Sequence, residues 1–286
     1  HGKILSRVKI SSPAKANPNT IFKCLTDLIE ELRLMARIPM SKIEGIGVGV
    51  PGIVDTRTNY ILAAPNINLT GFPLSAQLKK KYRTKVTLLN DVNAGLLGEA
   101  WLGCSKGLTQ VVGMFPGTGV GGAAIVDGKM LLGTQGAATE LGHMIIQVNG
   151  PLCHCGNHGC LEALASRWAI ERDIRALIKS GKKSVVKELN HGSLSTIKSR
   201  LLKDALQSKD QVVTAVLRNI SHVLGQACVS LNHTFNPQAI VLGGGVIKAC
   251  GFFIIPIVEK VLKADPFFKK FNACKVFQSS LGDDAV

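Results

Sequence analysis

Residues 140–162 read ELGHMIIQVNGPLCHCGNHGCLE, and this stretch carries the strongest chemical signal in the chain. Three thiolates and one imidazole satisfy the tetrahedral coordination of Zn²⁺, and the short spacings let one loop wrap the ion. Four protein ligands leave no open position for water or substrate, so the predicted metal is structural. The predicted ligands are His143, Cys153, Cys155 and Cys160. His154 and His158 compete as ligands, because spacing alone does not exclude them, and the alternative is a loop of ordinary thiols.

The remaining cysteines are scattered, which favours a metal site with reduced thiols over a disulfide framework. With 286 residues, 46% apolar and 19% charged, the chain is expected to fold as two domains with a cleft between them. It has no uninterrupted apolar run of about 18 residues and no signal-peptide order at its N-terminus. A cytoplasmic protein that does not engage a membrane is therefore expected.

The net charge is +15, which raises the question of nucleic-acid binding. The lysines and arginines are spread along the chain, and only 5% of residues are aromatic, so no basic and aromatic stacking platform is visible. We expect no nucleic-acid partner. A diffuse positive field is compatible with an anionic nucleotide as ligand.

Apolar periodicity and turn residues predict alternating strands and helices. The expected elements are a strand at 2–10, a helix at 20–38, strands at 43–50 and 86–89, a helix at 92–101, a glycine-rich hairpin at 111–126 with a turn at 127–128, helices at 159–178 and 211–235, and a strand at 239–242. The polar stretch 190–209 is expected to form a loop and a surface helix.

Asn90 and Asp91 follow the strand expected at 86–89, at the kind of strand end where α/β proteins build sites. The carboxylate of Asp91 is placed to accept a hydroxyl proton, and the amide of Asn90 to orient the same substrate. Asp91 is equally suited to cap the helix at 92–101. The pattern leaves both roles open, and one residue can serve both.

Two glycine-rich stretches are candidate phosphate loops, because glycines let backbone N–H groups converge on phosphate oxygens. One is Pro116-Gly117-Thr118-Gly119-Val120-Gly121-Gly122, and the other is Leu242-Gly243-Gly244-Gly245 after a predicted strand. Each alone is equally typical of a tight turn. Two such loops in one chain fit a nucleotide held from two sides.

Glu140 and Glu162 flank the predicted zinc ligands, so folding of the loop brings both carboxylates into one neighbourhood. Such acceptor groups bind sugar hydroxyls. These carboxylates are therefore candidate sugar contacts.

Together these residues resemble the ROK family (repressors, open reading frames and sugar kinases), most closely its bacterial glucokinases. The resemblance spans nearly the whole chain. Its most specific part is Glu140-Leu-Gly-His143 followed by Cys153-x-Cys155-Gly-x-x-Gly-Cys160-x-Glu162. The supporting motifs are Gly47-Val-Gly-Val-Pro51-Gly52, Asn90-Asp91, Gly117-Thr-Gly-Val-Gly-Gly122 and Leu242-Gly-Gly-Gly245.

The resemblance implies an actin-like ATPase (ribonuclease H-like) fold whose two α/β domains close on ATP and a hexose. A small domain is expected at residues 1–92 and a large domain with the zinc loop at 93–286. Asp91 would be the general base on the sugar 6-hydroxyl. The other implied sugar contacts are Asn66, Asn90, Glu140, His143 and Glu162, with His143 using one ring nitrogen for zinc and the other for sugar.

The resemblance also assigns the nucleotide contacts, with Mg²⁺ accompanying ATP. They are Gly117, Thr118 and Gly119 in the first glycine loop, and Gly243, Gly244 and Gly245 in the second. A homodimer or homotetramer is the expected assembly.

The chain departs from the family pattern at several points. Family members begin with an Asp-x-Gly-Gly-Thr phosphate loop, whereas this sequence starts at His1 in what resembles the second strand. It stops at Leu281-Gly-Asp-Asp-Ala-Val286, where the family usually continues through a helix, so we expect it to be trimmed at both ends. Pro116 and Arg167-Trp168 are also unusual.

Overall resemblance alone favours glucose over fructose, mannose, allose or N-acetylmannosamine as substrate. Because the same family includes sugar-responsive repressors that carry a helix-turn-helix, a noncatalytic sugar-binding regulator is the other alternative. The carboxylate at Asp91 favours the kinase.

Overall fold

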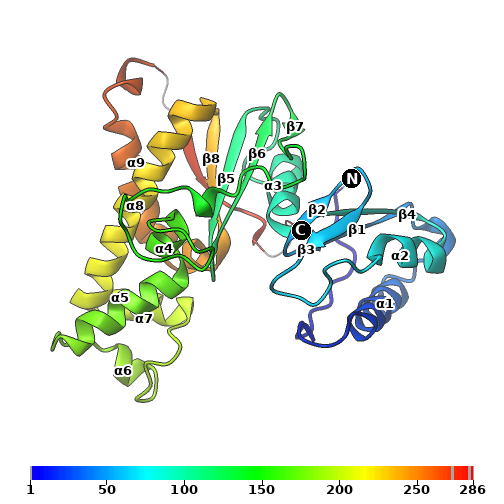
Figure 1. The fold of residues 1–286 in the computed structure, drawn as a ribbon, viewed down its shortest axis with the longest axis horizontal. Coiled ribbons are helices and arrows are strands. Elements are labelled where there is room, and N and C mark those ends of the chain that lie inside the picture. Colours follow the sequence, from blue (N-terminus) through cyan, green and yellow to red (C-terminus); the bar gives the residue numbers. More distant parts are fainter. Residues whose placement is uncertain (1, 272–273, 283–284, 286) are drawn as a thin grey trace. The chain divides into compact units, whose positions relative to one another are not determined.

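The structure is a computed structural model that describes residues 2–271, 274–282 and 285. Backbone contacts divide the described chain into two units. Residues 2–95 and 132–138 form unit 1, and residues 96–131 and 139–285 form unit 2. Each unit combines helices with strands (Figure 1). The domain bounds expected from the sequence, 1–92 and 93–286, stay a prediction.

Unit 1 is built on two small sheets. Its elements are α1 (Pro18–Met35), η1 (Met40–Lys42), β1 (Gly45–Val50), β2 (Ile53–Asp55), β3 (Tyr60–Ala63), α2 (Leu74–Tyr82), β4 (Lys85–Asn90) and the first turn of α3 (Asp91–Leu102). β1 and β4 pair in parallel, with Val50 opposite Asn90, and β2 pairs antiparallel with β3. Val50, Ile61, Leu78 and Leu88 are buried in the core of this unit. Its architecture thus presents the Asn90-Asp91 pair directly at the end of a sheet strand.

The strand predicted at residues 2–10 is wrong. Residues 2–12 are described and form neither strand nor helix, and the side chains of Ile4 and Leu5 are 51% and 62% exposed. A strand needs a neighbour that completes its ladder of hydrogen bonds, and β1 pairs instead with β4. Side-chain pattern alone does not reveal whether such a neighbour exists.

Unit 2 contains a five-stranded sheet in the order β7-β6-β5-β8-β9. Its strands are β5 (Val111–Pro116), β6 (Val120–Val126), β7 (Lys129–Met130), β8 (Ala239–Leu242) and β9 (Lys275–Gln278). Its helices are the rest of α3, η2 (Leu141–His143), α4 (Leu161–Ala165), α5 (Arg167–Lys179), α6 (Val186–Leu189), α7 (Ser199–Gln207), α8 (Gln211–Phe235), α9 (Gly244–Lys263) and η3 (Phe268–Lys270). β5 runs parallel to β8 and antiparallel to β6. The carboxyl ends of β5 and β8 therefore lie at the same edge of the sheet.

Several predicted helices and turns take a different form in unit 2. The turn at Asp127-Gly128 joins β6 to β7, whereas β5 and β6 are joined at residues 117–119. The helix predicted at 159–178 is interrupted at Ser166, which is extended and whose hydroxyl accepts a hydrogen bond from the amide of Ala169 at the start of α5. The predicted surface helix, α7, buries Leu201 and Leu202 and packs against α9.

The helix α8 is long and apolar enough to cross a membrane by length and composition. Its apolar side chains are instead buried against α4, α5 and α9, and α8 and α9 pack side by side (Figure 1). The apolar composition of α8 therefore belongs to the core of unit 2.

A buried carboxylate fixes the segment after β9. Glu99 on α3 is fully buried and accepts hydrogen bonds from the hydroxyls of Ser279 (2.6 Å) and Ser280 (3.0 Å). It also accepts from the backbone amides of Leu281 (2.8 Å) and Cys104 (2.9 Å). Burial raises the pKa of Glu99, but these hydrogen bonds outweigh it and hold the pKa at about 2.

We predict that Glu99→Ala lowers the free energy of unfolding by about 2–4 kcal/mol, because it removes a buried carboxylate that accepts four hydrogen bonds and leaves its donors, most of them partly buried, without that acceptor. Urea denaturation measures the change. Because the folded pKa lies below the unfolded value, the stabilisation is complete above about pH 4.5 and is lost as the pH falls toward 2. The difference between wild type and variant should therefore shrink in acid.

The matched control is Glu259→Ala, which removes an exposed carboxylate 3.4 Å from Lys263 and should change stability by less than about 0.5 kcal/mol. Equal losses in the two variants would contradict the role of Glu99, as would a difference that stays constant down to pH 2.

Candidate functional site

The four predicted metal ligands converge in unit 2. Their ligand atoms all lie within 4.8 Å of one another. The sulfurs of Cys155 and Cys160 are 3.7 Å apart, and the Cys153 sulfur is 3.8 Å from His143 Nδ1. Tetrahedral Zn²⁺ with bonds of about 2.3 Å to sulfur requires edges of about 3.8 Å, so the donor set fits this ion. Since Nδ1 faces the thiols, the Nε2 atom of His143 remains for another partner.

The competing histidines lie outside this cluster. His158 Nδ1 is 3.1 Å from the Gly150 carbonyl, and the His154 ring packs on Trp168 with centroids 4.5 Å apart. Trp168 also packs against buried Cys153 and Cys160. The unusual Trp168 thus packs against the cysteine loop and supports its conformation.

The protonation of the thiols also favours a cation at their centre. Burial, followed by the neighbouring thiols, raises the pKa of Cys160 to about 12, and burial raises the pKa of Cys153. The pKa of Cys155 is lowered instead, chiefly by a hydrogen bond from the Asn157 backbone. Two of the three thiolates are therefore costly here without a counter-charge. A divalent ion would offset that cost, because it binds the deprotonated form.

Glu162 joins the cysteine loop to the turn between β5 and β6. It stands on the first turn of α4, and its Oε2 accepts a hydrogen bond from the amide of Val120 at 3.0 Å. Its Oε1 is 3.8 Å from the Cys153 sulfur. A Cβ atom on Gly119 would collide with Oε2, so the carboxylate reaches the turn only because residue 119 is glycine.

Three further hydrogen bonds hold the same turn. The Gly117 amide donates to the Gly119 carbonyl at 2.8 Å, and the Arg167 amide donates to the Gly117 carbonyl at 2.9 Å. The guanidinium of Arg167 donates to Thr118 Oγ1 at 3.1 Å. With the Gly117 and Val120 amides engaged, the amides of Thr118 and Gly119 are the donors of the turn that remain for a ligand.

The second glycine loop lies against the first. Gly244 begins α9 with φ +79°, and a Cβ atom there would lie 2.5 Å from the Pro116 carbonyl oxygen. A Cβ atom on Gly243 would lie 2.5 Å from the Phe115 ring. The parallel pairing of β5 with β8 therefore brings Gly117–Gly119 and Gly243–Gly245 together, next to the N-terminus of α9, where backbone amides favour anions. Pro116 marks the point of contact.

In unit 1 the capping role falls mainly on Asn90. Its Oδ1 accepts hydrogen bonds from the amides of Val92 (2.9 Å) and Asn93 (3.1 Å), and its Nδ2 donates to the Gly52 carbonyl at 2.9 Å. Asp91 Oδ1 accepts from the Val92 amide at 2.9 Å. Asp91 Oδ2 is left for a ligand, and burial raises the pKa of this carboxyl.

Asn66 follows β3 in the same unit. It is exposed on the rim of a hollow of about 480 Å³ that Asn68 and Thr70 also line. The backbone of Ala63 and Ala64 approaches Gly52 so closely that a Cβ atom there would clash, and the Gly52 carbonyl accepts from Asn90. Thus the β3 end and the Asn90-Asp91 pair are tied through one glycine.

The predicted site residues therefore form two groups, each described within its own unit. Asn66, Asn90 and Asp91 belong to unit 1, and the glycine loops, the metal ligands, Glu140 and Glu162 belong to unit 2. Glu140 is exposed immediately before η2, and its carbonyl accepts from the amide of His143 at 2.9 Å. The sequence flagged Arg167 only as a departure from a family pattern, and its contacts with the turn were not predicted.

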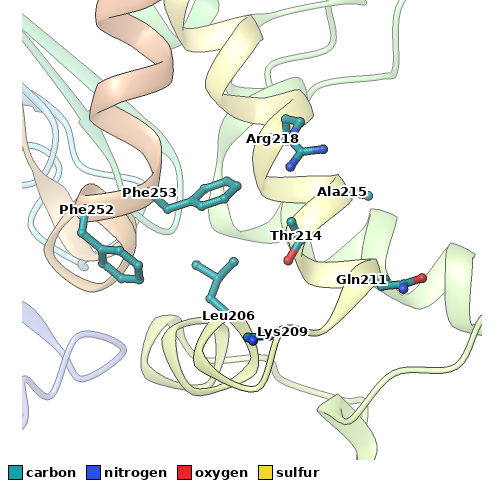
Figure 2. Close-up of a pocket in the computed structure, with 8 residues that line it drawn as sticks. All are labelled: Leu206, Lys209, Gln211, Thr214, Ala215, Arg218, Phe252 and Phe253. Carbon is teal, nitrogen blue, oxygen red and sulfur yellow. The ribbon is translucent and has the colours of Figure 1, made fainter.

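A separate hollow of about 410 Å³ lies where α7, α8 and α9 approach one another (Figure 2). Figure 2 shows the rings of Phe252 and Phe253 on one side and Thr214 and Arg218 of α8 on the other. None of the predicted site residues lines this hollow.

Comparison with known proteins finds one matching family and two kinds of relative, glucokinases and repressors. The model of the ROK family matches residues 1–286. The glucokinase of Thermotoga maritima is 33% identical over 286 residues, covering 99% of this chain and 88% of the relative. The xylose repressor of Caldicellulosiruptor bescii is 30% identical over 266 residues, covering 93% of this chain and 66% of the relative.

A solved structure supports the same likeness. The crystal structure of a ROK family glucokinase from Streptomyces griseus in complex with glucose and AMPPNP matches with a TM-score of 0.82 and 28% identity. The match covers 99% of this chain and 89% of that one. The α/β actin-like ATPase fold expected from the sequence is thereby confirmed.

We predict that His143→Ala lowers the zinc content of the purified protein from about one ion per chain to near zero, because a closed site that loses one of four ligands binds far more weakly. Elemental analysis measures the content. His158→Ala is the control and should keep its zinc. Full zinc in the His143 variant, or none in the wild type, would contradict the ligand assignment.

Proposed function

Because the chain belongs to the ROK family, we propose that it transfers the γ-phosphoryl group of ATP to the 6-hydroxyl of a hexose, with glucose as the first candidate. The observation that carries the proposal is Asp91, a partly buried carboxylate with one oxygen uncommitted at the end of a sheet strand. It supports the kinase because phosphoryl transfer to a hydroxyl needs an acceptor for one proton.

In the proposed reaction Asp91 Oδ2 accepts the proton of the 6-hydroxyl as the sugar oxygen attacks the γ-phosphorus. The bond between that phosphorus and the oxygen bridging to the β-phosphate breaks, and ADP leaves. The raised pKa of Asp91 makes the carboxylate a stronger base. Asn90, whose side chain is engaged by three backbone groups, holds this end of the strand and has one N–H left for the sugar.

The nucleotide is proposed to bind at the glycine loops of unit 2. The free amides of Thr118 and Gly119 and the N-terminus of α9 offer donors to the phosphates, and Gly243–Gly245 permit close approach. Mg²⁺ accompanying ATP would neutralise charge that develops on the phosphates. The chain itself contributes position and hydrogen-bond donors.

Sugar hydroxyls other than the 6-hydroxyl are proposed to be held by Asn66, Glu140, His143 and Glu162. His143 suits a double role, because its Nδ1 faces the thiols and its Nε2 does not. Zn²⁺ bound to the cysteine loop would fix the imidazole orientation without touching the reacting atoms. We further propose a cytoplasmic enzyme that assembles as a homodimer or homotetramer.

A noncatalytic sugar-binding regulator is the second candidate, and the likeness to xylose repressors favours it. Such a protein would bind sugar without releasing ADP. Another hexose, such as fructose, mannose, allose or N-acetylmannosamine, is the alternative within the kinases.

The test is an ATP-dependent panel of these sugars on the full-length protein, with ADP release as the readout and sugar binding measured in parallel by calorimetry. The proposal expects sugar-dependent ADP release, largest with glucose. Sugar binding without ADP release for every sugar would establish the regulator instead.

We predict that Asp91→Asn lowers kcat by about 10²–10⁴-fold while changing sugar affinity far less, because the amide keeps the size and cap of the side chain but accepts no proton. Steady-state kinetics and calorimetry give the two quantities. If Asp91 served only as a cap, the variant would turn over at a near-normal rate, since Asn caps a helix as well as Asp.

The pH profile provides a second readout of the same residue. Catalysis needs ionised Asp91, so kcat should fall as the pH drops through a pKa that burial has raised above the usual value for aspartate. The residual activity of Asp91→Asn should lack this acid limb. An identical limb in both proteins would assign the titration to another group.

A further inference from the structure

Arg167 occupies a defined place beside the turn at residues 117–119. It is the first residue of α5, and its backbone amide donates to the Gly117 carbonyl at 2.9 Å. The preceding Ser166 is fully buried and its hydroxyl accepts from the amide of Ala169. The backbone at residue 167 is therefore fixed against the turn independently of the arginine side chain.

Neighbouring side chains orient the guanidinium of Arg167 but engage only some of its N–H donors. One NH2 group donates to Thr118 Oγ1 at 3.1 Å, and Nε lies 3.5 Å from Glu171 Oε1. A guanidinium has five N–H donors, so most of them remain available. The side chain is 31% exposed, and Thr118 at the tip of the turn is exposed. A ligand seated on the turn can therefore reach the guanidinium.

The charge of Arg167 is only partly compensated. Glu171 is largely buried and makes a shorter contact, 2.6 Å, with the NH2 of Arg175. Arg175 is fixed in turn by the carbonyls of Leu194 and Ser195, both at 2.6 Å. Arg167 thus shares one carboxylate with Arg175, while the Glu162 carboxylate at the turn accepts a hydrogen bond from the Val120 amide.

We propose that Arg167 is a phosphate-binding residue for the nucleotide, and this inference rests on the proposed function. The free amides of the turn, the N-terminus of α9 and the guanidinium all stand beside the same short segment, residues 116–119. Arginine binds phosphate through two parallel N–H donors, which a backbone amide alone does not provide. The Thr118 hydroxyl orients the Arg167 guanidinium at the tip of the turn, and the Glu171 carboxylate orients it from α5.

The experiment compares the affinities of ADP and adenosine by calorimetry for wild type, Arg167→Met and Arg167→Lys. Loss of the guanidinium should raise the Kd for ADP about tenfold or more and leave the Kd for adenosine within about twofold, because only ADP carries phosphates. Arg167→Lys keeps the positive charge but lacks the paired N–H donors of the guanidinium, so its affinity for ADP should lie between those of Arg167→Met and wild type. Added salt should weaken ADP binding more in wild type than in Arg167→Met.

The matched control is Arg218→Met, which removes the same charge from α8 at the hollow of Figure 2 and should leave the Kd for ADP unchanged. An equal rise for ADP and adenosine in Arg167→Met would mean that the turn has collapsed, and no rise would mean that Arg167 touches no phosphate. Either result overturns the inference. If ADP affinity depends on Arg167 as expected but the wild type phosphorylates no sugar, the proposed function alone is overturned. If the wild type binds no ADP, both the proposed function and the role of Arg167 are overturned.

Discussion

The hydrogen bond from the Val120 amide to the Glu162 carboxylate is the contact on which the link between the cysteine loop and the glycine turn of unit 2 depends. Glu162 follows Cys160 by two residues, so its position is set by the cysteine loop and the start of α4. Val120 begins β6, directly after the glycine turn. One carboxylate therefore ties the candidate metal loop to the candidate phosphate turn, at a spot that any side chain on Gly119 would block.

The same segment continues to organise the turn beyond Glu162. Ser166 interrupts the helix and starts α5, which brings the Arg167 amide to the Gly117 carbonyl and the guanidinium to Thr118. Loop, α4 and the first turn of α5 thus run along one side of residues 117–120, and Gly244 closes the other side against Pro116. In the proposed kinase the sugar-binding carboxylate of Glu162 therefore lies next to the phosphate-binding turn. The hydrogen bond from the Val120 amide and the short chain segment from Glu162 to Arg167 link the two.

Sequence reasoning predicted local features well where a single pattern determines them. The apolar stripe of α8 and the strand β8 were predicted at the residues where they occur, and the spacing of the cysteines predicted a convergent donor set. Sequence reasoning failed where the outcome depends on a partner distant in sequence or on a local polar contact. Residues 2–10 carry a strand-like pattern without a ladder, and the break at Ser166 depends on a side-chain cap that apolar periodicity does not register. The choice of His143 over His154 and His158 likewise required the fold.

Amide hydrogen exchange of Val120, followed by NMR with zinc bound and after chelation, tests most directly the claim that the metal loop and the phosphate turn act as one mechanical unit. The account predicts that removing zinc speeds exchange at Val120 by about tenfold or more, because Glu162 loses its fixed position, while amides in the buried middle of α8 keep their protection. A Val120 amide that remains protected while the amides of residues 153–160 exchange freely would contradict it.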